Sequence, residues 1–102
     1  MYFKMAILTF ILDCWDPNSD YIGNIATTKT SKTCQRWKDQ VPHPHSFSAD
    51  PSVLDAGNKC RNPDKKDGGP WCFTSDPDTE WEFCDIPLCS GKCFLSIRMF
   101  HS

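Results

Sequence analysis

The sequence predicts a small disulfide-rich domain of loops and turns, with a few short antiparallel strands and little or no helix. Three observations predict it. Seven cysteines occur in 102 residues, a density typical of chains cross-linked in oxidising compartments. Eight prolines are spread along the chain, and proline interrupts helices. Two short segments place aromatic residues at every second position, which is the period of a strand.

These two segments are Trp71–Thr74 and Trp81–Cys84. Side chains alternate between the faces of a strand, so Trp71 and Phe73 share one face while Cys72 takes the other. Asp76-Pro77-Asp78 predicts the turn of a hairpin that joins the two strands. We therefore expect a ribbon that is anchored by sulfur on one face and displays aromatic rings outward on the other.

Residues that favour turns or extended backbone recur along the rest of the chain. Aspartate followed by proline occurs again at Asp16-Pro17 and Asp50-Pro51, and each pair predicts a turn. Gly23 indicates either a positive φ or a close backbone approach. Thr27–Thr30 is β-branched and favours a strand, whereas Pro42 and Pro44 favour extended backbone.

The two ends differ from this pattern. Residues 1–13 begin with a short apolar segment that fits either a partial secretory signal or a fragment boundary, and it is too short to span a bilayer. Residues 90–102 form a tail whose Cys93 is left over once the other six cysteines form a framework. We expect Cys93 to be unpaired, although pairing with another chain or a neighbouring domain is the alternative.

Spacing alone does not choose among the pairings that six cysteines allow. The residues between them resemble the kringle family, and the Pro42–Phe47 and Cys84–Pro87 segments look most like growth-factor kringles. The resemblance covers residues 14–89, with 1–13 and 90–102 outside it. It rests on these segments: Tyr21-x-Gly23, Cys34-Gln35-x-Trp37, Pro42-His43-x-His45-x-Phe47, Cys60-Arg61-Asn62-Pro63-Asp64, Gly69-Pro70-Trp71-Cys72-Phe73-Thr74 and Trp81-x-Phe83-Cys84-Asp85-Ile86-Pro87-x-Cys89.

The resemblance implies a kringle fold with the disulfides Cys14–Cys89, Cys34–Cys72 and Cys60–Cys84. It also implies a ligand-binding surface, because many kringles hold lysine side chains between aromatic rings and carboxylates. The matching aromatic residues here are Trp71, Phe73 and Trp81, which we call the aromatic trough. Asp64 matches the first acid of the family's pair, Lys66 stands at the second, and Asp67 follows as a possible substitute.

Two further departures weaken the expected lysine site. Positions that often carry a cation for the ligand's carboxylate hold Ser46 and Glu80. We therefore expect weak or absent lysine binding, with the rings supplying most of any affinity. A third departure is Ser31, where the family usually has glycine. If this position needs a positive φ, serine is strained there.

The function expected is that of a non-catalytic, secreted or ectodomain module that binds a protein. A purely structural spacer in a larger receptor, growth factor or protease-like protein is the alternative. The sequence contains no nucleophile motif that would predict catalysis and no C-x-x-C pair that would predict a zinc site. No cofactor is expected. A net charge of -2 argues against nucleic acid. A basic group could contact a sulfated polysaccharide; its members are Lys29, Lys32, Arg36 and Lys38.

Overall fold

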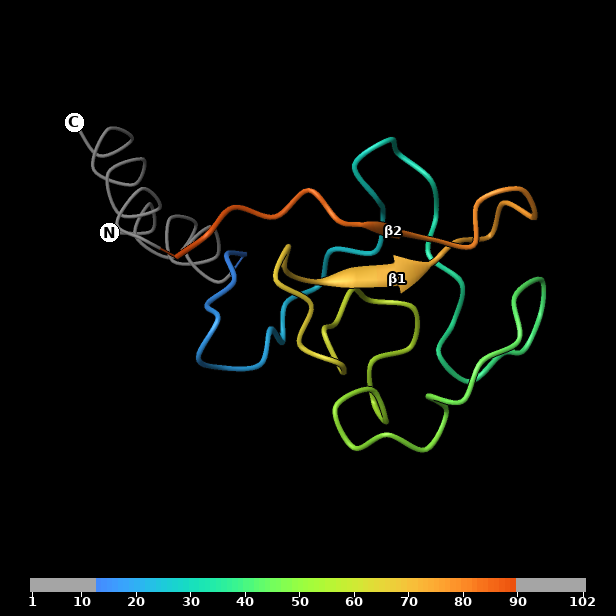
Figure 1. Ribbon diagram of the computed structural model, residues 1–102, viewed down its shortest axis with the longest axis horizontal. Helices are drawn as coiled ribbons and strands as arrows, with labels where there is room; N and C mark the ends of the chain where they lie inside the picture. Colours follow the sequence, from blue (N-terminus) through green and yellow to red (C-terminus); the bar gives the residue numbers. More distant parts are fainter. Residues whose placement is uncertain (1–12, 90–102) are drawn as a thin grey trace, which may run out of the picture.

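The computed structural model describes residues 13–89 (Figure 1). Its strands are β1 (Trp71–Phe73) and β2 (Trp81–Phe83), which lie side by side near the centre while loops surround them. The predicted loop-built fold is confirmed. No helix in the described part of the chain is long and apolar enough to cross a membrane. The predictions for residues 1–12 and for Cys93 lie outside the described residues.

The two strands form the predicted hairpin. They pair antiparallel, with Trp71 opposite Phe83, Cys72 opposite Glu82 and Phe73 opposite Trp81. At the turn between them, the backbone N–H of Thr79 donates to the carbonyl of Asp76 at 3.1 Å. This register places the aromatic residues of the two strands opposite each other.

Isolated bridges surround this hairpin. Arg61 pairs with Trp71, Cys34 with Thr74, and Thr28 with Cys84. Strand β1 therefore has β2 on one edge and Arg61 on the other, whereas the Thr28–Cys84 bridge lies on the outer side of β2. Both strands thus have backbone partners on their outer edges.

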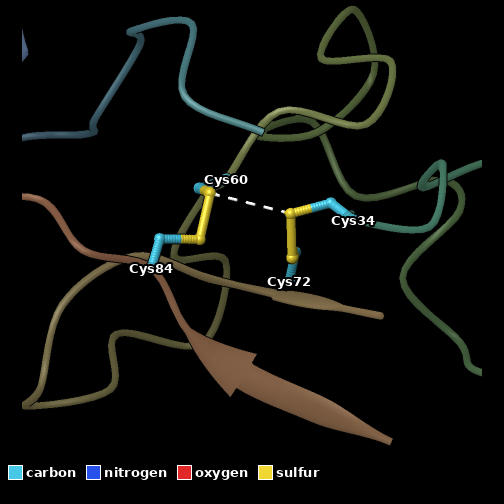
Figure 2. A group of neighbouring side chains, drawn as sticks. All are labelled: Cys34, Cys60, Cys72 and Cys84. Atoms are coloured by element: carbon cyan, nitrogen blue, oxygen red, sulfur yellow. Dashed lines mark hydrogen bonds between the residues drawn. A yellow bond between two sulfur atoms is a disulfide. The ribbon is translucent and has the colours of Figure 1, made fainter. Parts of the chain in front are cut away.

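Three disulfides hold the loops together: Cys14–Cys89, Cys34–Cys72 and Cys60–Cys84. This is the pairing that the family resemblance implies. The outer bond closes a separation of 75 residues, and the two inner bonds lie against each other beneath β1 (Figure 2), with the sulfur atoms of Cys34 and Cys60 3.8 Å apart. Closing loops in this way stabilises small domains by roughly 2–4 kcal/mol per bond.

The inner cysteines also have the geometry of a metal cluster, since all four sulfur atoms lie within 4.8 Å of one another. Each sulfur is bonded to another sulfur, however, and structural zinc sites use thiolates. The cluster is therefore a crossed pair of disulfides at the centre of the domain.

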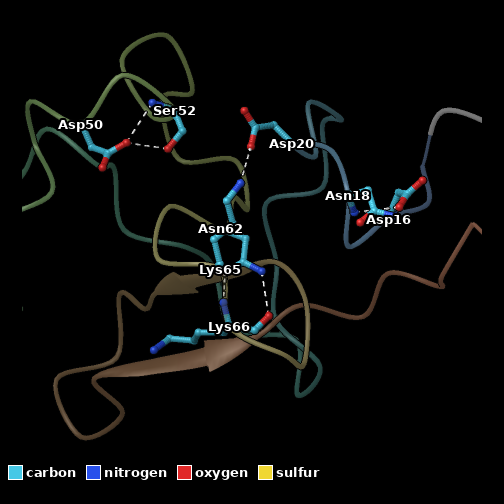
Figure 3. Close-up of polar contacts among 8 residues, drawn as sticks. All are labelled: Asp16, Asn18, Asp20, Asp50, Ser52, Asn62, Lys65 and Lys66. Carbon is cyan, nitrogen blue, oxygen red and sulfur yellow. Dashed lines mark hydrogen bonds and ion pairs between the residues drawn. The ribbon is translucent and has the colours of Figure 1, made fainter.

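The three aspartate–proline turns share one hydrogen-bonding pattern. In each, the aspartate carboxylate accepts the backbone N–H two residues further on, as Figure 3 shows for Asp16 with Asn18 (2.8 Å) and for Asp50 with Ser52 (2.9 Å). Asp76 accepts in the same way at the hairpin turn. Hydrogen bonds from Ser52 lower the pKa of Asp50 because they stabilise its ionised form. The three Asp-Pro pairs therefore form their turns through the same interaction, a hydrogen bond from a backbone N–H to the aspartate carboxylate.

Two backbone expectations are confirmed. Ser31 has a φ of 67°, the left-handed region that favours glycine. Gly23 is a point of close approach, because a Cβ added there would overlap the Tyr21 hydroxyl. That hydroxyl accepts the backbone N–H of Ile25 and donates to Asp13, and burial raises the pKa of Tyr21 to about 12.

Candidate functional site

Strand β1 carries the centre of a cluster of aromatic rings. The ring of Trp71 lies in edge-to-face contact with Trp37 at 5.2 Å, Phe73 at 5.1 Å and Phe47 at 5.6 Å. Such contacts add to the stabilisation from burial itself. Trp71 is 2% exposed, so its ring belongs to the core of the domain.

Phe73 is covered in the same way, at 6% exposure. The ring of His45 stacks on it at 4.6 Å, and Trp37 contacts it at 5.8 Å. His45 is held in place because its Nδ1 accepts the backbone N–H of Phe47 and its Nε2 contacts the carbonyl of Asp39. The segment that contains Pro42 and Pro44 thus packs the rings of His45 and Phe47 over β1.

The expectation that Trp71 and Phe73 face outward is therefore wrong. Their shared strand face was predicted correctly, but that face is covered by Trp37, His45 and Phe47. Strand alternation tells which side chains share a face and says nothing about what packs over it. The loop segments that supply the cover are distant in sequence, so no local pattern around β1 reveals them.

Trp81 is the member of the trough that reaches solvent. It is 37% exposed, while its ring keeps edge contacts with Trp71 at 5.6 Å and with Phe83 at 5.1 Å. The packed rings beneath it fix its position. Trp81 is therefore a rigid aromatic anchor of the kind enriched at protein interfaces.

Asp64 supplies the carboxylate beside these rings. Its Oδ1 accepts the indole N–H of Trp71 at 2.9 Å, and its Oδ2 lies 3.0 Å from the ammonium of Lys66. We call the group formed by the Asp64 carboxylate and the rings of Trp71 and Trp81 the amine seat. It has the elements that recognise an alkyl ammonium: one anion and aromatic faces.

Lys66 lies in this seat. Its ammonium is 4.6 Å from the centroid of the Trp81 ring and 5.0 Å from that of Trp71. The sequence shows Lys66 at the position of a missing acid, and the structure adds that its side chain reaches the remaining acid. The signal that could have predicted this is the spacing Asp64-x-Lys66 next to an aromatic strand, with opposite charges two residues apart.

Asp67 is not part of this contact. It lines a cavity of about 450 Å³ whose lining also includes Trp15, Tyr21 and Lys66. Within residues 13–89 its carboxylate makes no ion pair, so the structure does not bring it to Lys66 as a second acid of the seat. Its predicted role as a substitute remains a prediction.

Two matches with known proteins bear on the family of this chain. A family model described as the kringle domain matches residues 14–89. This chain belongs to the kringle family. A human protein described as a putative apolipoprotein(a)-like protein 2 is 41% identical over 95 aligned residues, which span 87% of this chain and 71% of the human protein. The growth-factor kringle resemblance is not tested by these matches.

Lys29, Lys32 and Arg36 of the basic group contact other residues of this kringle. Arg36 pairs with Asp39 at 3.7 Å, the Lys32 ammonium donates to the Thr30 hydroxyl at 2.9 Å, and Lys29 lies 6.0 Å from the Phe83 ring. Hydrogen bonds from the side chains of Thr28 and then Thr30 lower the pKa of Glu82, which keeps an anion beside the lysines. Binding of a sulfated polysaccharide remains a prediction.

Proposed function

We propose that this kringle is a non-catalytic extracellular module that recognises a protein partner through the aromatic trough. Trp81 is the ring that meets the partner, Trp71 and Phe73 support it from beneath, and Asp64 lies at its edge. The observation that supports the proposal is the exposure of Trp81 on an aromatic cluster whose other rings are buried or half-buried. The three disulfides favour an oxidising compartment.

The chemistry of the trough favours weak recognition of amines. An ion pair at an exposed carboxylate contributes only about 0–1 kcal/mol, and a cation above an exposed ring about 0.5–1 kcal/mol. Glu80 and Ser46 offer no positive charge to a ligand carboxylate. Binding of lysine analogues in the millimolar range or weaker follows from these terms.

The second candidate is a spacer that orients neighbouring domains through other faces. The burial of Trp71 and Phe73 favours it, because these rings are fully used in packing. The two candidates differ in what Trp81 does. A spacer needs no exposed indole, whereas a recognition module loses its anchor when that indole is removed.

The test is an NMR titration of the oxidised domain with two probes, Nα-acetyl-lysine methyl ester and 6-aminohexanoate. We expect both to shift the Trp81 indole N–H signal weakly and with similar affinity, since the carboxylate of the second probe finds no cation. Trp81→Ala should abolish the effect on the domain's spectrum. Ile22→Ala is the matched control, because Ile22 is an exposed apolar residue elsewhere on the surface.

Two results would contradict the proposal. Micromolar saturation by 6-aminohexanoate would mean that a cationic subsite exists despite Glu80 and Ser46. Equal spectral shifts in the wild-type and Trp81→Ala domains would place any binding elsewhere and favour the spacer.

A further inference from the structure

Lys66 makes with its own domain the contacts that a bound lysine side chain would make. Its ammonium lies 3.0 Å from the Asp64 carboxylate, and the centroids of two indole rings are within 5.0 Å. Both oxygens of the Asp64 carboxylate already have a partner, since Oδ1 accepts the Trp71 indole N–H. An incoming ammonium therefore meets a seat whose charge is already neutralised.

The loop backbone holds Lys66 in this position. The Asn62 side chain accepts the backbone N–H of Lys66 at 2.7 Å and donates to its carbonyl at 2.9 Å. Asp64 is only two residues away from Lys66 in the same loop. These bonds fix the backbone of Lys66 in the same loop as Asp64, so its side chain starts close to the carboxylate.

The neighbouring Lys65 provides an internal comparison. Its backbone has a φ of 56°, and Figure 3 shows its side chain leaving the loop in a different direction from that of Lys66. Lys65 reaches Asp20 at 3.2 Å, and its side chain is 69% exposed against 28% for Lys66. Two adjacent lysines thus have opposite environments, and only one contacts the rings.

We propose that Lys66 is an intramolecular ligand of the amine seat and the residue that closes this kringle to external lysine. The inference rests on the proposed function for the location of the site. It adds a cause for the weak lysine binding: the amine seat is able to hold an ammonium, but Lys66 already occupies it. A tethered group acts at an effective concentration in the millimolar range, so an external amine has to compete at that concentration or above.

The test compares Lys66→Ala with Lys65→Ala in the oxidised domain, using Nα-acetyl-lysine methyl ester as the probe. Removing an occupant that fills the seat about nine-tenths of the time should tighten binding about tenfold. The Lys65→Ala domain should bind like the wild type. Adding Asp64→Asn to Lys66→Ala should remove the gain, because the seat then lacks its anion.

A ligand-free measurement accompanies the titration. In the wild type and Lys65→Ala, the ε-methylene protons of Lys66 should be shifted upfield by the indole rings. Trp81→Ala or Asp64→Asn should return them towards ordinary values. Lys66 signals at ordinary values in the wild type would overturn the inference whatever the titration gives.

The titration also separates this inference from the proposed function. If the wild type and Lys66→Ala bind the probe equally, and Trp81→Ala abolishes binding to both, the inference is overturned and the proposed site stands. If Lys66→Ala binds no probe at any concentration, the inference and the weak amine recognition are both overturned.

Discussion

Strands β1 and β2 have the same pattern, tryptophan, one residue, then phenylalanine, yet they differ in environment. All three residues of β1 are buried, whereas Trp81 of β2 is exposed and Glu82 and Phe83 are half-buried. The difference comes from their neighbours. Both strands have backbone partners on their outer edges, but rings from residues 37–47 pack over Trp71 and Phe73 of β1. Position in the fold, and not side-chain type, decides which of the rings are buried.

The largest effect is expected when Trp71 and Trp81 are each replaced by alanine in the oxidised domain. Trp71→Ala should lower the free energy of unfolding by about 3–5 kcal/mol, as expected for a large buried ring. Trp81→Ala should lower it by about 1 kcal/mol or less, because part of that ring is already in water. Guanidinium denaturation followed by circular dichroism measures both.

The milder pair Trp71→Phe and Trp81→Phe keeps the comparison measurable if Trp71→Ala does not fold. Trp71→Phe should still cost about 1–3 kcal/mol, since it leaves Asp64 without the indole N–H. Similar losses of unfolding free energy at Trp71 and Trp81 would contradict the assignment of Trp71 to the core and Trp81 to the surface.

A smaller effect is expected at the turn that supports β2. The backbone N–H of Lys29 donates to the Phe83 carbonyl at 3.0 Å, and the Thr30 hydroxyl donates to Glu82 at 2.8 Å. Ser31 lies in this turn with a positive φ. Ser31→Gly should therefore raise the free energy of unfolding by about 1 kcal/mol by relieving the strained backbone.

Ser31→Ala is the control for this turn, because alanine also has a Cβ and should give no gain. Equal stabilisation by alanine and glycine would mean that the serine hydroxyl, and not the backbone conformation, is the cause. Thermal unfolding of the three oxidised proteins distinguishes these results.

Much of the fold could be predicted because its signals are local. The Asp-Pro turns, the hairpin and the strained Ser31 each depend on residues that are close in sequence, and the structure contains all of them. The pairing of the cysteines came from the family resemblance, since spacing alone leaves several connectivities open. Local chemistry and family pattern together were sufficient to predict the scaffold.

The environment of the trough could not be predicted, because it depends on contacts between distant segments. Burial of Phe73 requires His45, which lies 28 residues earlier in the chain and is positioned by its own loop. The Lys66 ammonium likewise lies over the ring of Trp81, which is 15 residues further along the chain, at 4.6 Å from its centroid. The sequence identified the candidate residues, while packing decided which of them are exposed.

The central claim is that Trp71 belongs to the core and Trp81 to the surface. Hydrogen exchange of the indole N–H groups, followed by NMR in the oxidised domain without ligand, measures this difference directly. We predict slow exchange at Trp71, whose buried N–H donates to Asp64 at 2.9 Å, and fast exchange at Trp81. Equally fast exchange at both indoles would contradict the account.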